Sequence, residues 1–335
     1  MVTFVPTCEI VAKKMLVLCL GFIDFNQKCL DQTDNKIEKI TMEKSSKLSD
    51  KFVFYWTFNC IASSLMPMIA SLLGGNKNLP MVVWYPYDPN KTPYFHLTYI
   101  WEIFCISNLG LIYAVLDLVF PCIAIVLGQQ FKILASNFKN NVYRALVDSE
   151  VSEKIVQTFS KNLHNDSFNE EIFEIMNSAK FKKNNARYLR KNVKHHQQLL
   201  QYCADVSDIL SIFLMGKVSA AIFNTLFMAF SLITTGNRAM IFGLGSYMVS
   251  TSIELLIYTY SGQVLTQNAD IVGTLYESPW YMCDVHFQRT FHIVQMRASK
   301  IVNVKAGNYF TMSASSYITF MKSLGIVYSA LEGVN

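Results

Sequence analysis

The chain has 335 residues, of which 52% are hydrophobic and 13% aromatic, while only 16% are charged. Ordinary soluble domains carry charge on about a quarter of their residues, so this composition and the mean hydropathy of +0.25 argue against a soluble globular protein. The net charge is +5, but the sequence shows no basic patch with interleaved aromatic residues that could stack on bases. This argues against nucleic-acid binding. A membrane is therefore the expected solvent.

Six apolar stretches are long enough to be membrane-spanning helices. A helix needs about 20 apolar residues to cross the hydrocarbon layer, where an unpaired backbone amide is costly. In chain order the stretches are 4–25, 52–73, 99–127, 206–234, 240–260 and 310–331. The first is the weakest, and its rival interpretation is a signal peptide, although it lacks a basic start and a small-residue cleavage site. The sequence thus predicts an all-α multi-pass membrane protein with about six spans.

Lysine and arginine collect in alternate connecting segments. Six lysines lie between the first two spans and twelve basic residues lie in 129–204, whereas 74–98 contains only Lys77 and Lys91. Because cytoplasmic loops hold the excess of basic residues, we expect 129–204 in the cytoplasm and the C-terminus outside. We expect 129–204 and 263–305 to be cytoplasmic helical segments. The basic run 187–196 is either a solvated helix or part of a bundle that joins subunits.

The sequence contains no motif of an enzyme or a metal site. It has no GxSxG, Walker, HExxH or Rossmann glycine pattern, and its eight cysteines include no CxxC pair. His195 and His196 are adjacent, so they point to different sides of a helix and are poorly placed for chelation. We therefore expect no catalytic residues, no metal and no cofactor.

Several ionisable residues lie inside the expected spans, where each costs about 2.5–3.5 kcal/mol at mid-membrane unless it has a partner or water. They are Glu102, Asp117, Asp208, Lys217, Glu254 and Lys322. Glu102 and Asp208 lie close to span ends. Asp117, Lys217 and Lys322 are the better candidates for an interior polar network. Lys322 lies among small residues of the last span, a pattern that suits either a water-lined helix or close helix packing.

The C-terminal third resembles the insect odorant receptor family. Four motifs follow one another in the family's order: 258–263 (YTYSGQ), 275–281 (LYESPWY), 293–300 (IVQMRASK) and 305–313 (KAGNYFTMS). Upstream, 79–88 (LPMVVWYPYD) resembles the family's proline-aromatic-aspartate loop. The closing segment departs from the family pattern, since 322–331 keeps only the lysine, the Tyr-Ser pair and the final leucine.

The resemblance implies a seven-span fold with a cytoplasmic N-terminus. Aligned from the C-terminus, the stretch 4–25 becomes the family's second span, so about six of the seven helices are expected here and the first is expected to be missing by truncation. The resemblance also implies a tetramer with a central pore, a cytoplasmic helical anchor and a shared olfactory co-receptor. Because the co-receptor's long cytoplasmic insertion is lacking, this chain resembles a tuning subunit in the plasma membrane of olfactory neuron dendrites.

The resemblance further implies an odorant pocket in the outer half of each subunit and a gate in the last span. Small volatile ligands favour enclosed, mostly apolar cavities. The pocket candidates are Met66, Ile69, Leu73, Tyr94, Tyr99, Ile103, Ser107, Phe242 and Tyr247. The pore candidates are Val327, Ala330, Leu331 and Val334, with Glu332 near the outer mouth. Ordinary helix packing is the competing interpretation of each pocket residue.

Three other membrane classes remain as alternatives. A G-protein-coupled receptor requires the opposite orientation and aspartate-arginine and asparagine-proline motifs that are not found. A gustatory receptor channel has a threonine-tyrosine to glutamine-phenylalanine motif at its C-terminus, which is missing here. A transporter fits the hydropathy but would be favoured by inverted repeats, and none is detected.

Overall fold

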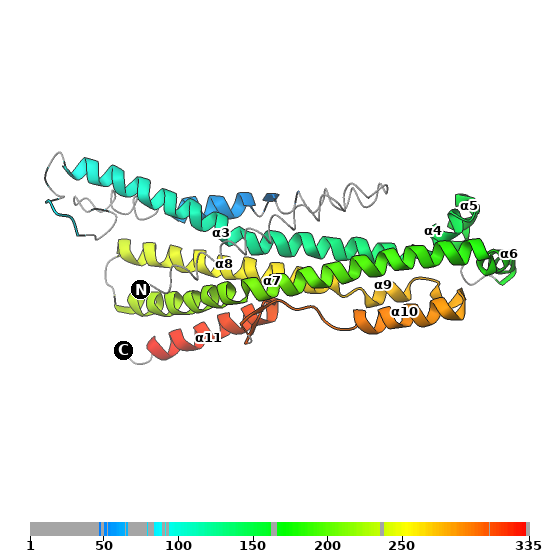
Figure 1. The fold of residues 1–335 in the computed structure, drawn as a ribbon. Coiled ribbons are helices and arrows are strands. Elements are labelled where there is room, and N and C mark those ends of the chain that lie inside the picture. The colour runs from blue at the N-terminus through cyan, green and yellow to red at the C-terminus, as the bar shows by residue number, and fades with distance from the viewer. Residues whose placement is uncertain are drawn as a thin grey trace. The chain divides into compact units, whose positions relative to one another are not determined.

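The computed structural model describes residues 47, 50, 51, 53–63, 65, 79, 84–88, 91, 94–161, 166–234, 238–307 and 309–332. The expected span 4–25 and the pocket or pore candidates Met66, Ile69, Leu73 and Val334 lie outside these residues. What is described is almost entirely helical (Figure 1). This agrees with the all-α expectation.

Three long helices dominate the chain. They are α3 (Tyr94–Lys139), α7 (Ala179–Thr234) and α8 (Arg238–Ala269). Among the described residues, Tyr94–Lys139 and Ala179–Ser231 are long and apolar enough to cross a membrane. The basic run 187–196 lies inside α7, which continues as one helix from Ala179 to Thr234. Ser178 caps its start, because the Ser178 hydroxyl accepts a hydrogen bond from the Phe181 amide at 3.2 Å.

Shorter elements lie between α3 and α7 and after α8. They are α4 (Asn141–Val147), α5 (Glu153–Lys161), α6 (Asp166–Asn177), α9 (Val272–Tyr276), the 3₁₀ turn η1 (Trp280–Met282), α10 (Val285–Ala298), β1 (Lys305–Ala306), β2 (Phe310–Thr311) and α11 (Ala314–Glu332). The segment 263–305 was expected to be helical, but the turns around η1 and the residues 301–304, which belong to no helix or strand, interrupt it. Pro279 lies just before η1 and removes a backbone donor, which favours a break there.

The chain divides into two compact units. The first unit contains Val126–Asp208 and Val264–Val304. The second unit contains Glu43–Ile125, Ile209–Gln263 and Lys305–Asn335. The boundaries of the first unit lie close to the ends of the two segments expected in the cytoplasm. Most of the expected span residues after position 50 fall in the second unit.

Aromatic rings form the core of the first unit. Phe138 and Phe291 meet edge to face at 6.3 Å between ring centroids, and Trp280 stacks on Phe291 at 5.9 Å. The imidazole of buried His196 lies edge-on to both Phe131 and Phe138. Such pairs contribute about 0.5–1.5 kcal/mol each beyond the burial of their surface. They hold α3, α7 and α10 together within this unit.

The first unit also buries a chain of neutral amides. The Asn141 amide of α4 donates to the Asn185 side-chain oxygen at 2.6 Å and accepts from the Asn192 amide at 3.1 Å. Asn185 in turn donates to Cys283 Sγ at 3.4 Å. Asn185 and Asn192 are seven residues apart on α7, so they lie on one face of that helix. These bonds satisfy polar groups that would otherwise be costly to bury.

The second unit has a mixed apolar and charged interior. Trp56, Ala114 and Leu118 form a buried cluster with the partly buried Cys60, Cys122 and Ile257 around it. The ring of Phe120 stacks on Tyr258 at 5.8 Å. The charged part of this interior is the site described next.

Candidate functional site

A cluster of three charged side chains joins three helices of the second unit. Lys217 of α7 forms ion pairs with Asp117 of α3 and with Glu254 of α8, the latter at 2.9 Å. The Tyr258 hydroxyl donates to Asp117 at 3.3 Å. The Asp117 side chain is only 5% exposed, so its charge depends on these partners. We call Asp117, Lys217, Glu254 and Tyr258 the charge cluster.

Aromatic rings complete the surroundings of the lysine. Its ammonium group lies 5.5 Å from the ring centre of Tyr113 and 5.9 Å from that of Phe213. Rings at such distances attract a cation through their quadrupole. Two carboxylates share one ammonium, so the charge cluster carries one formal negative charge in excess. One lysine therefore links α3, α7 and α8 by electrostatic attraction.

The sequence anticipated part of this cluster. Asp117 and Lys217 were expected in an interior polar network, and they pair with each other. Lys322, the third candidate, lies exposed on α11, and it forms no ion pair with the described residues. The third charged member of this network is Glu254. Hydropathy showed that Glu254 needed a partner, but only the rotation of α8 decides that the partner is Lys217.

Hydroxyl and amide groups connect the helical residues 53–63 to α8. The Asn59 amide donates to the Ser250 hydroxyl at 3.0 Å, and the Ser63 hydroxyl donates to the same oxygen at 3.2 Å. Ser250 lies one turn of α8 before Glu254. The polar side of α8 thus contacts two different partners along its length.

A tyrosine-rich loop packs against the first turns of α3. Tyr85 donates to the buried Glu102 carboxylate at 2.6 Å, and the hydroxyls of Tyr87 and Thr98 lie 2.9 Å apart. The bond to Glu102 raises the pKa of Tyr85 to about 12, because ionisation would place two negative charges together. The ring of Tyr87 lies 5.5 Å from that of Tyr94, one of the expected pocket residues.

The other expected pocket residues fall on two helices. Tyr99, Ile103 and Ser107 follow one another at four-residue spacing on α3, so they share a face, and all three are half-buried. Tyr247 lies on α8 and is 49% exposed, and Phe242 lies near the start of α8. Of the pore candidates, Val327, Ala330 and Leu331 belong to α11, and Ala330 is exposed.

A short hairpin leads into α11 and was not anticipated as such. β1 and β2 pair antiparallel, with Lys305 opposite Thr311, so the expected span start at 310 is extended backbone and α11 begins only at Ala314. The Ser313 hydroxyl caps this helix by accepting from the Ser316 amide at 3.3 Å. Gly307 has φ +59, a conformation that favours glycine, and its amide contacts the Ser211 hydroxyl of α7 at 3.0 Å.

The hairpin also lies very close to α8. A Cβ atom added at Gly262 would lie 2.4 Å from the Met312 backbone oxygen, a distance at which backbone must shift. The amide of Ala314 is 3.4 Å from the Gln263 side-chain oxygen, to which it donates. Contacts with α7 and α8 therefore fix the residues immediately before α11. This is the structural reason for glycine in the 258–263 and 305–313 motifs.

No group of three or more His, Cys, Asp or Glu among the described residues is placed to hold a metal ion. The two carboxylates of the charge cluster both pair with the Lys217 ammonium, so the cluster links helices. The apolar helices α3 and α7, which are long enough to cross a membrane, fit the class of helical membrane proteins.

Comparison with known proteins then gives the family. Residues 20–325 match the family model described as 7tm Odorant receptor, so the chain belongs to the 7tm odorant receptor family of multi-pass membrane receptors. Putative odorant receptor 85e of Drosophila melanogaster is 20% identical over 267 residues, which cover 75% of this chain. The chain spans 57% of the length of that curated relative.

Solved structures confirm the fold. The structure of the insect olfactory receptor OR5 from Machilis hrabei matches with a TM-score of 0.70, covering 97% of this chain and 79% of OR5. The OR5 structure in complex with eugenol matches with a TM-score of 0.68, covering 90% and 70%. Sequence identity is 13% in both comparisons. The predicted family and its helical membrane fold are therefore confirmed.

Proposed function

We propose that this chain is an odorant-binding subunit that forms, with a shared co-receptor, an odorant-gated non-selective cation channel. The family match over residues 20–325 is the observation that carries the proposal. OR5, whose fold the chain shares, has been solved in complex with eugenol, which supports a small-molecule ligand. The proposed location is the plasma membrane of olfactory neuron dendrites.

The proposed topology follows the basic residues and the two units. The spans are 4–25, 52–73, 99–127, 206–234, 240–260 and, starting with α11, 314–331, with 129–204 and 263–305 in the cytoplasm and the C-terminus outside. In this arrangement the first unit is the cytoplasmic anchor. Its packed aromatic core supports this role, because an anchor that joins subunits must keep its shape while the spans move.

The proposed odorant site lies in the outer half of the second unit. It uses the α3 face of Tyr99, Ile103 and Ser107, together with Tyr94, Phe242 and Tyr247, and with Met66, Ile69 and Leu73 of the preceding span. The three α3 residues share a face and are half-buried, which supports their grouping. If apolar contact dominates, each ligand methylene contributes at most about 0.8 kcal/mol, so odorant tuning is graded.

The proposed gate lies near the end of α11. Val327, Ala330, Leu331 and Val334 supply small or apolar side chains, and an apolar constriction excludes water until it widens. Odorant shifts the population towards the open arrangement because it binds that arrangement more tightly.

Current recording tests the proposal directly. We expect odorants to evoke cation current in oocytes that express this chain with the olfactory co-receptor, and none with the chain alone. The current should persist when G-protein signalling is blocked. Current that disappears under the block, or no current while the chain is present at the cell surface with the co-receptor, would contradict the channel proposal.

A pair of neighbouring substitutions tests the pocket. Ile103→Trp enlarges a half-buried side chain on the proposed pocket face, whereas Phe104→Trp enlarges a neighbour that is 59% exposed. We expect Ile103→Trp to change the ranking of odorants by current response and Phe104→Trp to preserve it, at equal surface expression. If both variants keep the original ranking, this face of α3 does not line the pocket.

A further inference from the structure

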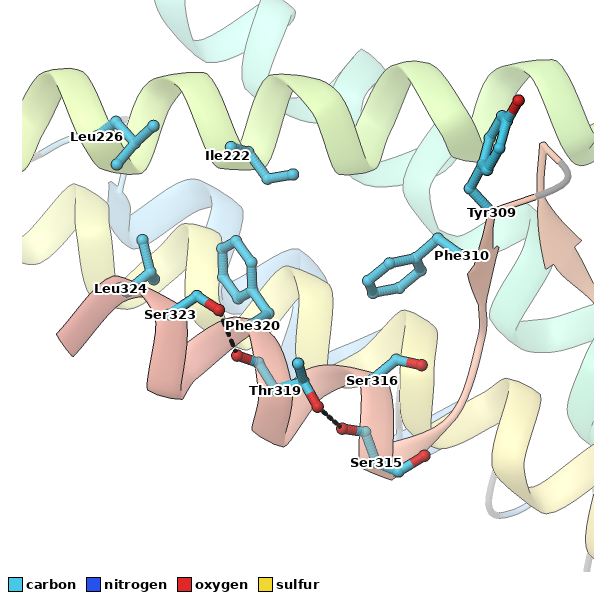
Figure 2. A pocket seen from close by; sticks show the side chains of 10 residues that line it. All are labelled: Ile222, Leu226, Tyr309, Phe310, Ser315, Ser316, Thr319, Phe320, Ser323 and Leu324. Carbon is cyan, nitrogen blue, oxygen red and sulfur yellow. Dashed lines mark hydrogen bonds between the residues drawn. The ribbon is translucent and has the colours of Figure 1, made fainter. Parts of the chain in front are cut away.

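The second unit contains a cavity of about 500 Å³ between α7 and the hairpin with α11 (Figure 2). Ile222 and Leu226 of α7 lie on one side of this partly open cavity, and Phe310 and Phe320 lie on the opposite side. Of the expected odorant-pocket residues whose side chains the structure describes, none lines this cavity; they are Tyr94, Tyr99, Ile103, Ser107 and Tyr247. The volume falls within the range of about 300–1,000 Å³ that is typical of small-molecule sites.

Hydroxyl groups of α11 line the remaining wall, and two of them already donate their protons along the helix. The Thr319 hydroxyl donates to the Ser315 carbonyl at 3.0 Å, and the Ser323 hydroxyl donates to the Thr319 carbonyl at 2.9 Å. Figure 2 shows these two bonds running along the helix. A hydroxyl that donates its proton in this way still has oxygen lone pairs with which to accept. Thr319 and Ser323 therefore offer acceptors rather than donors to a molecule in the cavity.

The chemistry of the walls defines a ligand class. An apolar body suits Ile222, Leu226 and Phe320, while a single hydrogen-bond donor suits the oxygens of Thr319 and Ser323. We propose that this cavity, which we call the α7–α11 cavity, binds a small amphipathic alcohol or phenol at a site separate from the odorant pocket. A ketone or ether of the same size has no donor and fits less well.

If the proposed function holds, an alcohol bound in the α7–α11 cavity should affect channel opening. α11 carries the proposed gate, and a molecule in the cavity contacts α7 and α11 at once. It stabilises the arrangement of these helices seen here and opposes any opening that moves α11 relative to α7. The alcohol therefore acts as an inhibitor of odorant-evoked current, and it is not competitive with the odorant.

Direct labelling tests the site without requiring a channel. The probe is 1-octanol carrying a photoreactive diazirine, applied to the purified full chain in detergent micelles, alone and with the co-receptor. We expect labels within 222–226, 309–310 and 315–324, and competition by 1-octanol about two- to tenfold stronger than by its methyl ether, as expected for one hydrogen bond. Equal competition by the alcohol and the ether, or uniform labelling of all apolar helices, would show a lipid-filled groove and overturn the proposal.

Two variants with a matched control locate the site. Ile222→Trp fills the cavity, while Phe223→Trp adds bulk to a neighbouring side chain that is 73% exposed and does not line it. We expect Ile222→Trp to reduce specific labelling at least tenfold and Phe223→Trp to leave it unchanged. Ser323→Ala removes one acceptor with little change in shape and should weaken octanol competition two- to tenfold. Unchanged labelling in both Ile222→Trp and Ser323→Ala would refute the site.

Current recording then separates the two proposals. If the chain conducts, 1-octanol should lower the maximal odorant response in the unmodified chain and lose this effect in Ile222→Trp. Inhibition that excess odorant fully overcomes would place the alcohol in the odorant pocket instead. If the chain does not conduct, the function proposal fails, and the labelling still decides whether the cavity binds alcohols.

Discussion

The two units bury polar side chains with different chemistry. The first unit uses neutral amides, in which Asn141 bonds to Asn185 and Asn192. The second unit uses charges, in which Lys217 is shared by Asp117 and Glu254. Neutral amides can each lose one bond at modest cost, whereas a charge left without its counter-ion must be resolvated or neutralised. In the second unit, both ion pairs depend on the same ammonium group, so the loss of Lys217 removes both at once.

The largest effect should come from removing the shared ammonium. Lys217→Met leaves two carboxylates unpaired, which costs roughly 3–5 kcal/mol when a buried pair is broken. We expect a large loss of surface expression and a lower melting temperature in detergent. Lys322→Met is the matched control, because that lysine is exposed on α11.

A neutral triple variant sharpens the same test. Asp117→Asn with Lys217→Met and Glu254→Gln removes all three charges, so it should recover much of the expression lost in Lys217→Met. The charge cluster would lose its proposed role if Lys217→Met behaved like Lys322→Met. Failure of the triple variant to recover expression would show that size and shape, rather than charge, matter at these positions.

Close helix contacts give the next effect in size. Gly262→Ala in the second unit places a Cβ against the Met312 backbone, and such overpacking costs roughly 1–3 kcal/mol. Gly245→Ala on the same helix meets nothing within 4 Å, so it should be neutral or slightly stabilising. Melting temperatures and surface expression of the two variants provide the measurement. Equal melting temperatures and expression in the two variants would mean that the hairpin backbone shifts at little cost and does not fix the start of α11.

The amide chain of the first unit should respond less than the charge cluster. Asn141→Ala removes the side chain that bonds to both Asn185 and Asn192. Each of these two buried amides then lacks one hydrogen-bond partner, so the free energy of unfolding should fall by about 1–3 kcal/mol. Asn140→Ala is the control, since Asn140 is half-buried and bonds only locally to Ser136. Thermal unfolding should separate the two variants. A loss as large as that of Lys217→Met would remove the contrast between the units.

Patterns along the chain predicted some of this and could not predict the rest. The apolar runs indicated helices because hydropathy is local, and charges inside spans indicated a polar network that does contain Asp117 and Lys217. The choice of Glu254 over Lys322 depends on helix rotation, which hydropathy does not encode. The amide chain gave no signal, because asparagine is common on exposed helices and its pairing depends on how α4 meets α7.

The hairpin before α11 could be predicted from the sequence only in part. Gly307 was visible in the 305–313 motif, and glycine is the residue expected where φ is positive. The family resemblance identified this motif, but the apolar pattern alone extended the last span back to 310. Only the pairing of Lys305 with Thr311 and the contact of Gly262 with Met312 show that the chain turns there.

The smallest effect should appear on acidification of the first unit. Burial among the Phe131 and Phe138 rings, with Arg297 and His195 nearby, lowers the pKa of His196 to about 4 from its usual 6.5. The unfolded chain therefore binds a proton below pH 6.5 that the folded chain does not, so stability falls as the pH drops from about 6.5 towards 4. At pH 5 the loss is at most about 2 kcal/mol.

His196→Phe tests this contribution because the ring is replaced and the proton site is removed. We expect the unmodified chain to lose melting temperature between pH 7 and pH 5 and the variant to lose less. His292→Phe is the control, since His292 lies exposed on α10 and should keep the full pH response. If His196→Phe also keeps the full response, acid sensitivity arises elsewhere, and the carboxylates of the charge cluster in the second unit become the next groups to neutralise.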